Sequence, residues 1–239
     1  MSGKHLKRLA APRTLRIHRK EKTWTTKISP GPHPLDKSIP LGSIVRDYLK
    51  LCDTYKEAKR VIANGDVLVD GVERKNHKFP CGFMDVLSIP KLKKDFRILF
   101  DRRGKLTLVP ISSKDAKWKL CRIENKTVLK GNKIQLNLHD GRNKIVEKDE
   151  YKTGDVLKIS LADRKISEVF PFTKGTVSMI IGGSHIGQIG TIEDVEIVYS
   201  SKPNIVTIKG DQKFSTIKDY VFPIGKTSPV IIPPEVKIQ

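Results

Sequence analysis

The sequence predicts an α+β fold in which β-strands predominate. Apolar residues at helical spacing are confined to residues 43–65, and short alternating segments separated by glycine turns recur from residue 97 onwards. The first 39 residues carry ten Lys and Arg against two acidic residues. These observations predict a basic N-terminal arm (1–40), a small two-helix module (41–90), a central β-barrel-like domain (91–172), a C-terminal small barrel (173–225) and an extended tail (226–239).

Two helices are predicted in the module. The first begins after Ser43 as N-cap and places one apolar face on the residues Ile44, Val45, Tyr48, Leu49 and Cys52. The second begins at a capping box formed by Thr54 and Glu57, and the pair Asn64-Gly65 ends it. Lys56, Lys59 and Arg60 share a face of this helix because they stand three and four residues apart. Their spacing fits a contact with an anionic partner, and it is equally typical of a solvated helix face.

Short strands follow the helices. Residues 67–69 read as a strand, Asp70-Gly71 as a two-residue turn that accepts positive φ, Val72 as the return strand and residues 86–89 as a closing strand. Because so few elements bury only a small core, the module is expected to need packing against neighbouring segments for its stability.

The distribution of charge indicates a polyanionic partner. The formal net charge is +20 with 38% hydrophobic residues. Besides the arm, residues 91–119 carry ten Lys and Arg against three acidic residues. Concentration of charge in two segments favours two contact surfaces over a general solubility device, and nucleic acid is the default partner.

The sequence gives no sign of a cofactor or a metal. Cys52, Cys81 and Cys121 are isolated, which argues against a disulfide framework or a zinc site and suits a reducing compartment. No apolar run approaches the length of a membrane span, and the N-terminus lacks the apolar core of a signal peptide. A cytoplasmic location without membrane contact is therefore expected.

The arm holds too many cations and prolines to bury a core of its own, so it is expected to be disordered alone, with a stiff link at residues 29–34. Trp24 offers a face on which a base stacks. Phosphate contacts are expected from the cations of the arm, namely Lys4, Lys7, Arg8, Arg13, Arg16, Arg19 and Lys20. A targeting signal or a flexible tail remains the alternative.

The central domain begins with a predicted hairpin around residues 101–104. Its tip and return strand carry Arg102, Arg103 and Lys105, which are expected to contact phosphates or, alternatively, to form an ordinary solvated loop. Further alternating strands are predicted at residues 118–123, 133–138, 144–146, 156–161 and 166–170.

The last domain contains two predicted strands, residues 176–181 and 190–198, which bracket a loop. Four glycines in this loop permit a tight turn and a close backbone approach, namely Gly182, Gly183, Gly187 and Gly190. His185, beside these glycines, is the one histidine of the sequence singled out as a candidate site residue. Residues 205–209 and 214–220 supply further strands, and residues 223–239 are expected to run extended along a surface. No strand, glycine-rich loop and helix follow one another in the order of a nucleotide site.

Three resemblances give these patterns a meaning. A helix with the pair Arg46-Asp47, a helix ending Ala-Lys-Arg-Val-Ile-x-x-Gly and a strand Asp-Val-Leu-Val-Asp-Gly resemble the RNA-binding fold named after the fourth protein of the bacterial small ribosomal subunit. This resemblance implies that Lys56, Lys59 and Arg60 touch RNA phosphates. Residues 174–198 are similar to the KOW motif, and Gly187 matches the glycine of that motif. This resemblance implies an SH3-like barrel.

Nearly the whole chain resembles the archaeal and eukaryotic family of small-subunit ribosomal protein four. The segment Lys4 to Pro12 resembles that family's start, and Gly-Gly-x-x-x-Gly at residues 182–187 resembles a later signature. The loop at residues 73–80 departs from the family in being more basic. The resemblance implies a structural constituent of the small subunit that binds its large rRNA beside neighbouring ribosomal proteins, does not form a homo-oligomer and is of the archaeal kind.

Two other functions remain as alternatives to a ribosomal constituent. A transcription-elongation or antitermination factor would also carry a KOW motif, and an RNA-modifying enzyme would also carry the small module. An enzyme needs a catalytic domain, and no acid pair, Cys/His arrangement or P-loop stands out in the sequence. A non-enzyme is therefore predicted.

Overall fold

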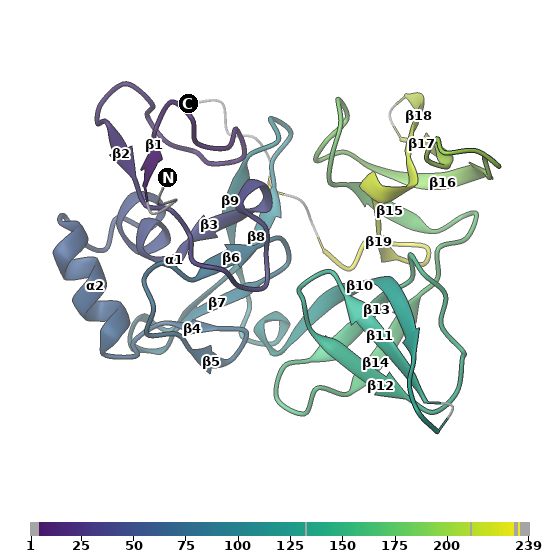
Figure 1. Ribbon diagram of the computed structural model, residues 1–239, viewed down its shortest axis with the longest axis horizontal. Helices are drawn as coiled ribbons and strands as arrows, with labels where there is room; N and C mark the ends of the chain where they lie inside the picture. The colour runs from purple at the N-terminus through teal and green to yellow at the C-terminus, as the bar shows by residue number, and fades with distance from the viewer. Residues whose placement is uncertain (1–4, 132, 211, 232–233, 235–239) are drawn as a thin grey trace. The chain divides into compact units, whose positions relative to one another are not determined.

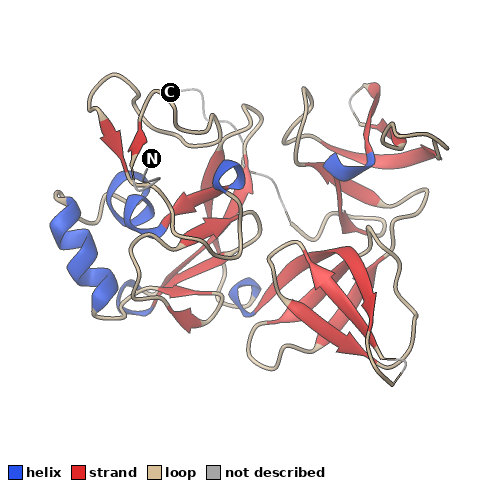
Figure 2. Cartoon of the chain, viewed as in Figure 1, coloured by secondary structure: helices blue, strands red, loops and turns tan. Residues whose placement is uncertain are grey.

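The computed structural model describes residues 5–131, 133–210, 212–231 and 234 (Figure 1). The chain divides into two compact units, and each is described by itself. The first unit comprises Met1–Leu99, Lys105–Lys119 and Leu161–Asp163, and the second comprises Phe100–Gly104, Leu120–Ser160 and Arg164–Gln239. Strands make up most of the regular structure in both units (Figure 2), as the sequence predicts.

A five-stranded sheet in the order β5-β4-β7-β8-β9 forms the centre of the first unit. Its strands are β4 (Leu68–Val69), β5 (Val72–Glu73), β7 (Val86–Ile89), β8 (Lys94–Phe100) and β9 (Leu106–Ile111). The predicted turn between β4 and β5 is confirmed, because Asp70 and Gly71 both have positive φ, 52° and 74°. The predicted hairpin of β8 and β9 is confirmed too, and β8 pairs with β7 of the two-helix module.

The described residues of this unit also form two strand pairs and three 3₁₀ turns. The pairs are β1 (Leu6–Lys7) with β2 (Trp24–Thr25) and β3 (Ser38–Pro40) with β6 (Pro80–Gly82). The 3₁₀ turns are Leu35–Lys37, Pro90–Leu92 and Asp115–Lys117.

The first helix begins earlier than the sequence predicts. Helix α1 (Leu41–Ser43) runs directly into a π-helical segment (Ile44–Tyr48). Ser43 is buried within this continuous helix, has helical backbone angles and makes no side-chain capping hydrogen bond. The backbone N–H groups of Leu41 and Gly42 donate to the carbonyls of Phe79 and His77 at 3.0 and 2.8 Å. A neighbouring loop therefore supplies the acceptors that a capping side chain would otherwise provide.

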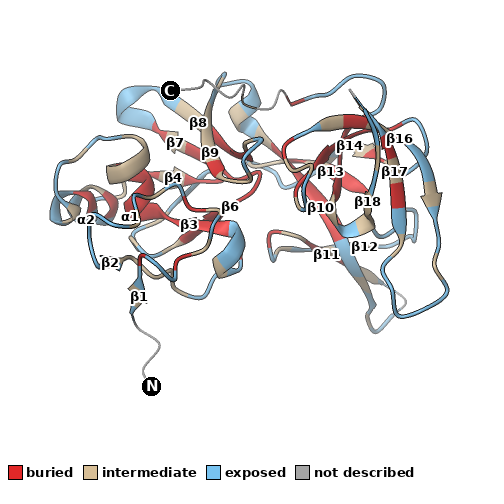
Figure 3. Cartoon of the chain, turned by 90° about the horizontal axis from the view of Figure 1, so that it is seen from above, coloured by how far each residue is buried: buried red, intermediate tan, exposed pale blue. Residues whose placement is uncertain are grey.

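Helix α2 (Tyr55–Ala63) matches its prediction. Glu57 N–H donates to Thr54 Oγ1 and Thr54 N–H donates to Glu57 Oε2, both at 3.3 Å, which completes the capping box. Gly65, at φ 83°, follows its C-terminus. The helix buries Ala58 and Ile62 and packs against α1 (Figure 3).

The arm corrects a second expectation, because its described residues are not a structureless tail. Leu106 N–H donates to Thr14 O at 2.9 Å and Ser29 N–H donates to Lys78 O at 2.9 Å. Ala11 and Leu15 are 5% and 4% exposed. The arm lacks a core of its own but shares that of the first unit, a possibility that composition does not reveal.

The described residues of the second unit form two five-stranded antiparallel sheets. The first has the order β12-β11-β10-β13-β14, and its strands are β10 (Trp118–Val128), β11 (Ile134–Leu138), β12 (Asn143–Val146), β13 (Val156–Ser160) and β14 (Ile166–Phe170). The second has the order β18-β17-β16-β15-β19, and its strands are β15 (Val177–Ile180), β16 (Ile189–Glu196), β17 (Ile205–Lys209), β18 (Lys213–Ile217) and β19 (Val221–Gly225). Each sheet buries its own apolar cluster, centred on Leu136 and Leu157 in the first and on Ile192 and Ile208 in the second.

Two expectations about the C-terminal residues are wrong. The strand expected at residues 214–220 ends at Ile217 and is followed by a 3₁₀ turn, Lys218–Tyr220. Residues 223–225, expected on the surface, belong to the fully buried strand β19, which pairs with β15. The sequence Val-Phe-Pro-Ile-Gly contains proline, which usually argues against a strand, but β19 is an edge strand of its sheet, where proline is accepted.

Candidate nucleic-acid interface

The exposed face of α2 carries three cations. Lys56, Lys59 and Arg60 are all exposed, whereas Ala58 and Ile62 of the same helix are buried. The three cations therefore lie off the buried face of the helix and present positive charge to solvent.

Tyr55 connects this face to two other elements. The guanidinium carbon of Arg46 lies 5.2 Å and Lys59 Nζ 5.6 Å from the centroid of the Tyr55 ring. The ring of His77, in the loop between β5 and β6, meets Tyr55 edge-on at 5.7 Å. A Cβ on Gly42 would lie 2.5 Å from the Tyr55 hydroxyl, so glycine is needed for the ring to lie against α1. We call Arg46, Tyr55, Lys59 and His77 the Tyr55 cluster.

The electrostatics of this cluster favour an anion. Burial lowers the pKa of His77, and the charges of Lys59 and Lys78 lower it further. The Arg46 guanidinium forms two hydrogen bonds with Asp47, at 2.7 and 3.0 Å, which hold it in place beside the ring and raise its pKa. Lys59 on α2 and Lys78 in the loop thus bring positive charge to the surroundings of His77, and a bound phosphate would offset that charge.

Sequence reasoning missed Tyr55, Arg46 and His77 as members of this cluster. The apolar spacing of α2 assigned Tyr55 to the core side, and it is in fact only partly buried. The available signal was the unusually basic loop of residues 73–80, which contains His77 and Lys78.

The arm presents an aromatic face and several cations. Trp24 is 55% exposed, with Lys7 Nζ 5.9 Å from its ring centroid and the His5 ring 5.6 Å away. The cations predicted to contact phosphate that are exposed in the arm are Lys7, Arg13, Arg16 and Lys20. Lys4 lies outside the described residues.

Arg8 and Arg19, predicted from the sequence to contact phosphates, hold the backbone of the arm in the structure. Arg8 is 7% exposed and donates to the carbonyls of Trp24 and His18 at 3.2 and 2.7 Å. Arg19 donates to the carbonyls of Ala11 and Pro12 at 2.7 and 2.9 Å. These two guanidinium groups hold the path of the arm and so position the exposed cations beside them.

In the second unit, the hairpin tip of residues 101–104 meets the glycine loop. Gly187 has φ 79°, and a Cβ there would lie 2.7 Å from the Asp101 carbonyl oxygen, so only glycine fits. Arg102 and Arg103 are exposed at the tip. The predicted domain boundaries put these arginines and Gly187 in separate domains, whereas the structure places the backbone of the hairpin tip against Gly187.

The other residues of the glycine loop have local partners. Gly182 and Gly183 lie against the Tyr220 ring, and Gly190 lies against the backbone of Lys209. The His185 ring stacks on Phe214, with centroids 4.0 Å apart and planes inclined by 15°. Lys105 lies at the start of the return strand and belongs to the first unit.

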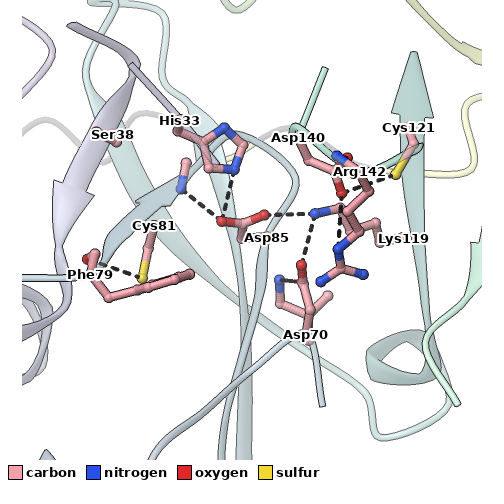
Figure 4. A network of polar contacts seen from close by, with 12 residues as sticks. His33, Ser38, Asp70, Phe79, Cys81, Asp85, Lys119, Cys121, Asp140 and Arg142 are labelled. Carbon is pink, nitrogen blue, oxygen red and sulfur yellow. Dashed lines mark hydrogen bonds and ion pairs between the residues drawn. The ribbon is translucent and has the colours of Figure 1, made fainter. Parts of the chain in front are cut away.

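A buried ionic network fixes the turns of the first unit (Figure 4). Lys119 Nζ donates to Asp70 Oδ2 and Asp85 Oδ1 at 2.8 and 2.7 Å, and His33 Nε2 lies 3.0 Å from Asp85 Oδ2. Asp70 also accepts from Val86 N–H and Asp85 accepts from Gly82 N–H. The charges of Lys119 and His33 outweigh burial and hold the pKa of Asp85 below its ordinary value.

No group of three or more His, Cys, Asp or Glu side chains suited to a metal ion occurs among the residues that the structure describes. The same described residues contain no helix long and apolar enough to span a membrane. The charge of +20, the exposed cations of α2 and the arm and the exposed Trp24 ring place the chain in the class of basic, mostly β proteins that present cations and aromatic rings on a folded surface.

Comparison with known proteins identifies the family. The model of the ribosomal family S4e matches residues 92–166, and that of the RS4NT domain matches residues 2–36. The chain is 50% identical over 231 residues to small ribosomal subunit protein eS4 of Methanosphaera stadtmanae, covering 96% of this chain and 95% of the relative. It is also 50% identical over 232 residues to the eS4 protein of Methanothermobacter thermautotrophicus, covering 96% of each.

A solved structure supports the assignment. The crystal structure of the 30S ribosomal protein S4e from Thermoplasma acidophilum matches with a TM-score of 0.71 and 42% sequence identity, over 80% of this chain and 97% of that one. The chain belongs to the S4e family of ribosomal proteins.

Proposed function

We propose that this chain is a structural constituent of the small ribosomal subunit, which binds and stabilises the large rRNA of that subunit. The observation that carries the proposal is the 50% identity, over nearly the whole chain, to proteins named small ribosomal subunit protein eS4. Its partners are that rRNA and neighbouring ribosomal proteins, its place of action is the ribosome in the cytoplasm, and it acts as a single copy without catalysis.

The cationic surfaces of the chain suit this function. The exposed face of α2 and the Tyr55 cluster supply charge for phosphates, and the arm adds Arg13, Arg16 and Lys20 with Trp24 as a stacking face. Side-chain contacts with the phosphate backbone of RNA position a protein on folded RNA without recognising the base sequence. Arg102 and Arg103 at the hairpin tip form a further phosphate contact in the same proposal.

The finer organisation is proposed with it. The division at residues 40, 90, 172 and 225 remains our domain proposal, with an SH3-like barrel of the KOW type at residues 173–225. The antiparallel sheet β18-β17-β16-β15-β19 and the fit of Gly187 against the Asp101 carbonyl support that proposal. The kinship with ribosomal proteins does not favour a transcription factor or an RNA-modifying enzyme.

The test is fractionation of native cell lysate on a sucrose gradient, with the chain followed through moderate-salt washing and RNase treatment. A ribosomal constituent migrates with the small subunit, resists the wash and is released when the RNA is digested. Migration in light fractions, or with RNA polymerase, would overturn the proposal.

A further inference from the structure

A groove in the second unit belongs to none of the surfaces predicted from the sequence. Two adjoining hollows, of about 260 and 450 Å³, share the lining residues Thr153, Phe172, Asn204 and Lys218. They therefore form one continuous depression, bounded by β10, the loop before β13 and the segments around β17 and the last 3₁₀ turn. We call it the Phe172 groove.

The base of the groove is held rigidly. Arg122 is 8% exposed and donates to the carbonyls of Asp219 and Val221 at 2.7 and 3.1 Å, and it pairs with Glu124 at 2.7 Å. The carboxylate of Asp155 accepts from Lys152 N–H at 2.8 Å and from Phe172 N–H at 2.9 Å. Both the loop at residue 152 and the backbone of Phe172 are thereby fixed before any ligand arrives.

The charges around the groove have different roles. Glu124 and Asp155 are engaged with Arg122 and with backbone N–H groups, and Lys126 is paired with Asp149. Lys152 is exposed on the rim, and Lys218 Nζ lies 5.4 Å from the centroid of the Phe172 ring. The lining thus carries the cations of Lys152 and Lys218 and the exposed carboxylate of Asp219, while the interior offers a ring, an amide and a hydroxyl group.

This composition selects one class of ligand. A phosphate alone would not need an aromatic wall, and an apolar side chain would not need Asn204 and Thr153 in the lining. Asn204 Oδ1 accepts from Val198 N–H at 3.0 Å, which fixes the orientation of its amide. A nucleobase satisfies both requirements, since its face stacks on an aromatic ring and its edge takes hydrogen bonds.

We infer that the Phe172 groove binds a single-stranded RNA nucleotide, whose base stacks on Phe172 and whose flanking phosphates contact Lys152 and Lys218. The inference rests on the proposed function and adds to it a binding site for an unpaired nucleotide of the RNA. The flexible side chain of Lys218 moves from above the ring to a phosphate when the base enters.

The experiment compares full-length variants for binding to an eight-nucleotide single-stranded RNA of mixed sequence and to small-subunit rRNA. Lys152→Glu/Lys218→Glu is expected to weaken binding to the short RNA about tenfold or more, because it replaces attraction to phosphates by repulsion. The matched control, Lys130→Glu/Lys165→Glu, makes the same charge change at exposed lysines outside the groove lining and is expected to have a smaller effect. Ultraviolet crosslinking of the wild type is expected to attach the RNA to the peptide that contains Phe172.

A second variant guards against misfolding. Phe172 packs against the apolar cluster of the second sheet, so Phe172→Leu keeps an apolar contact while removing the stacking face. It is expected to lose the crosslink with the thermal midpoint near that of the wild type.

The outcomes separate this inference from the proposed function. If rRNA binding persists while groove and control variants bind the short RNA equally, and no crosslink reaches Phe172, the groove is not an RNA site. If the groove variants change only the association with a neighbouring ribosomal protein, the occupant is a protein and the inference is wrong. A wild-type chain that binds neither RNA would overturn both.

Discussion

The ammonium of Lys119 lies 2.7 Å from the carboxylate of Asp85, and both side chains are buried, at 1% and 2% exposure. Lys119 stands at the start of β10 and Asp85 in the turn before β7, so the pair ties together segments 34 residues apart in the chain. Asp70 shares the same ammonium and also accepts the N–H of Val86. One lysine therefore pairs with both carboxylates that shape the turns of the first unit, and His33 adds a second partner for Asp85.

Replacing Lys119 by methionine should destabilise the first unit strongly. The change leaves the buried carboxylates of Asp70 and Asp85 without their cation, and removal of one partner from a buried ionic group typically costs about 3–5 kcal/mol. Urea unfolding, followed by a probe in the first unit, measures the loss. Lys117→Met, at an exposed position two residues earlier, is the control and should change the midpoint little. Equal midpoints for both variants would show that the network contributes nothing to stability.

The network also predicts how stability depends on acid. The pKa of Asp85 is lowered in the folded state by Lys119 and His33, so ionised Asp85 contributes stability above its unfolded pKa of about 3.9. That contribution is lost as the pH falls below this value towards the folded pKa. The difference in unfolding free energy between the wild type and Asp85→Asn should therefore stay level from pH 7 to about pH 5 and shrink below about pH 4. A difference that is the same at pH 3 and pH 7 would contradict this assignment.

The role of α2 is tested by charge reversal. Lys59→Glu/Arg60→Glu should weaken binding to small-subunit rRNA by about tenfold or more at moderate salt, because attraction to phosphates becomes repulsion. Both side chains are exposed, so the thermal midpoint should stay near that of the wild type. The same charge change at Lys93 and Lys94, exposed residues of the first unit outside α2, provides the control. Filter binding with equal affinities for the two double variants would remove α2 from the interface.

The arm is best tested without deleting it, since Ala11 and Leu15 are buried and truncation would damage the first unit. Neutralising Arg13, Arg16 and Lys20 to glutamine leaves the arginines that hold the arm, Arg8 and Arg19, intact. If each of the three residues neutralises one phosphate, the slope of log affinity against log salt should fall by about 2 to 3. Binding isotherms between 50 and 300 mM KCl measure the slope, and an unchanged slope would show that these cations do not reach phosphates.

Local signals in the sequence predicted local structure well. The capping box of Thr54 and Glu57 and the turn at Asp70-Gly71 depend on neighbours within three residues, and both are confirmed. Signals that depend on distant partners were missed. Ser43 has the residue type of an N-cap, but carbonyls of Phe79 and His77 perform that task.

The same limit applies to the candidate site. The helical spacing of Lys56, Lys59 and Arg60 placed them on one exposed face. Their connection through Tyr55 to His77 requires a loop that returns to the helix after the β4–β5 hairpin, and no local pattern encodes that contact. Lys119 was counted among the charges of a basic segment, and only the structure places it between two buried carboxylates.

His77 offers a direct report of phosphate binding. In the free protein burial and the charges of Lys59 and Lys78 lower its pKa, so the imidazole is neutral at pH 7. A phosphate bound at the Tyr55 cluster would offset those charges and favour the protonated ring, so the pKa of His77 should rise when rRNA binds. NMR titration of the ring protons in the free chain, and in its complex with a fragment of small-subunit rRNA, measures the shift. In Lys59→Gln the pKa of His77 in the free protein should already lie higher, because one of the two repelling cations is gone. A pKa that RNA leaves unchanged, in a complex formed at full affinity, would place the phosphates away from this cluster.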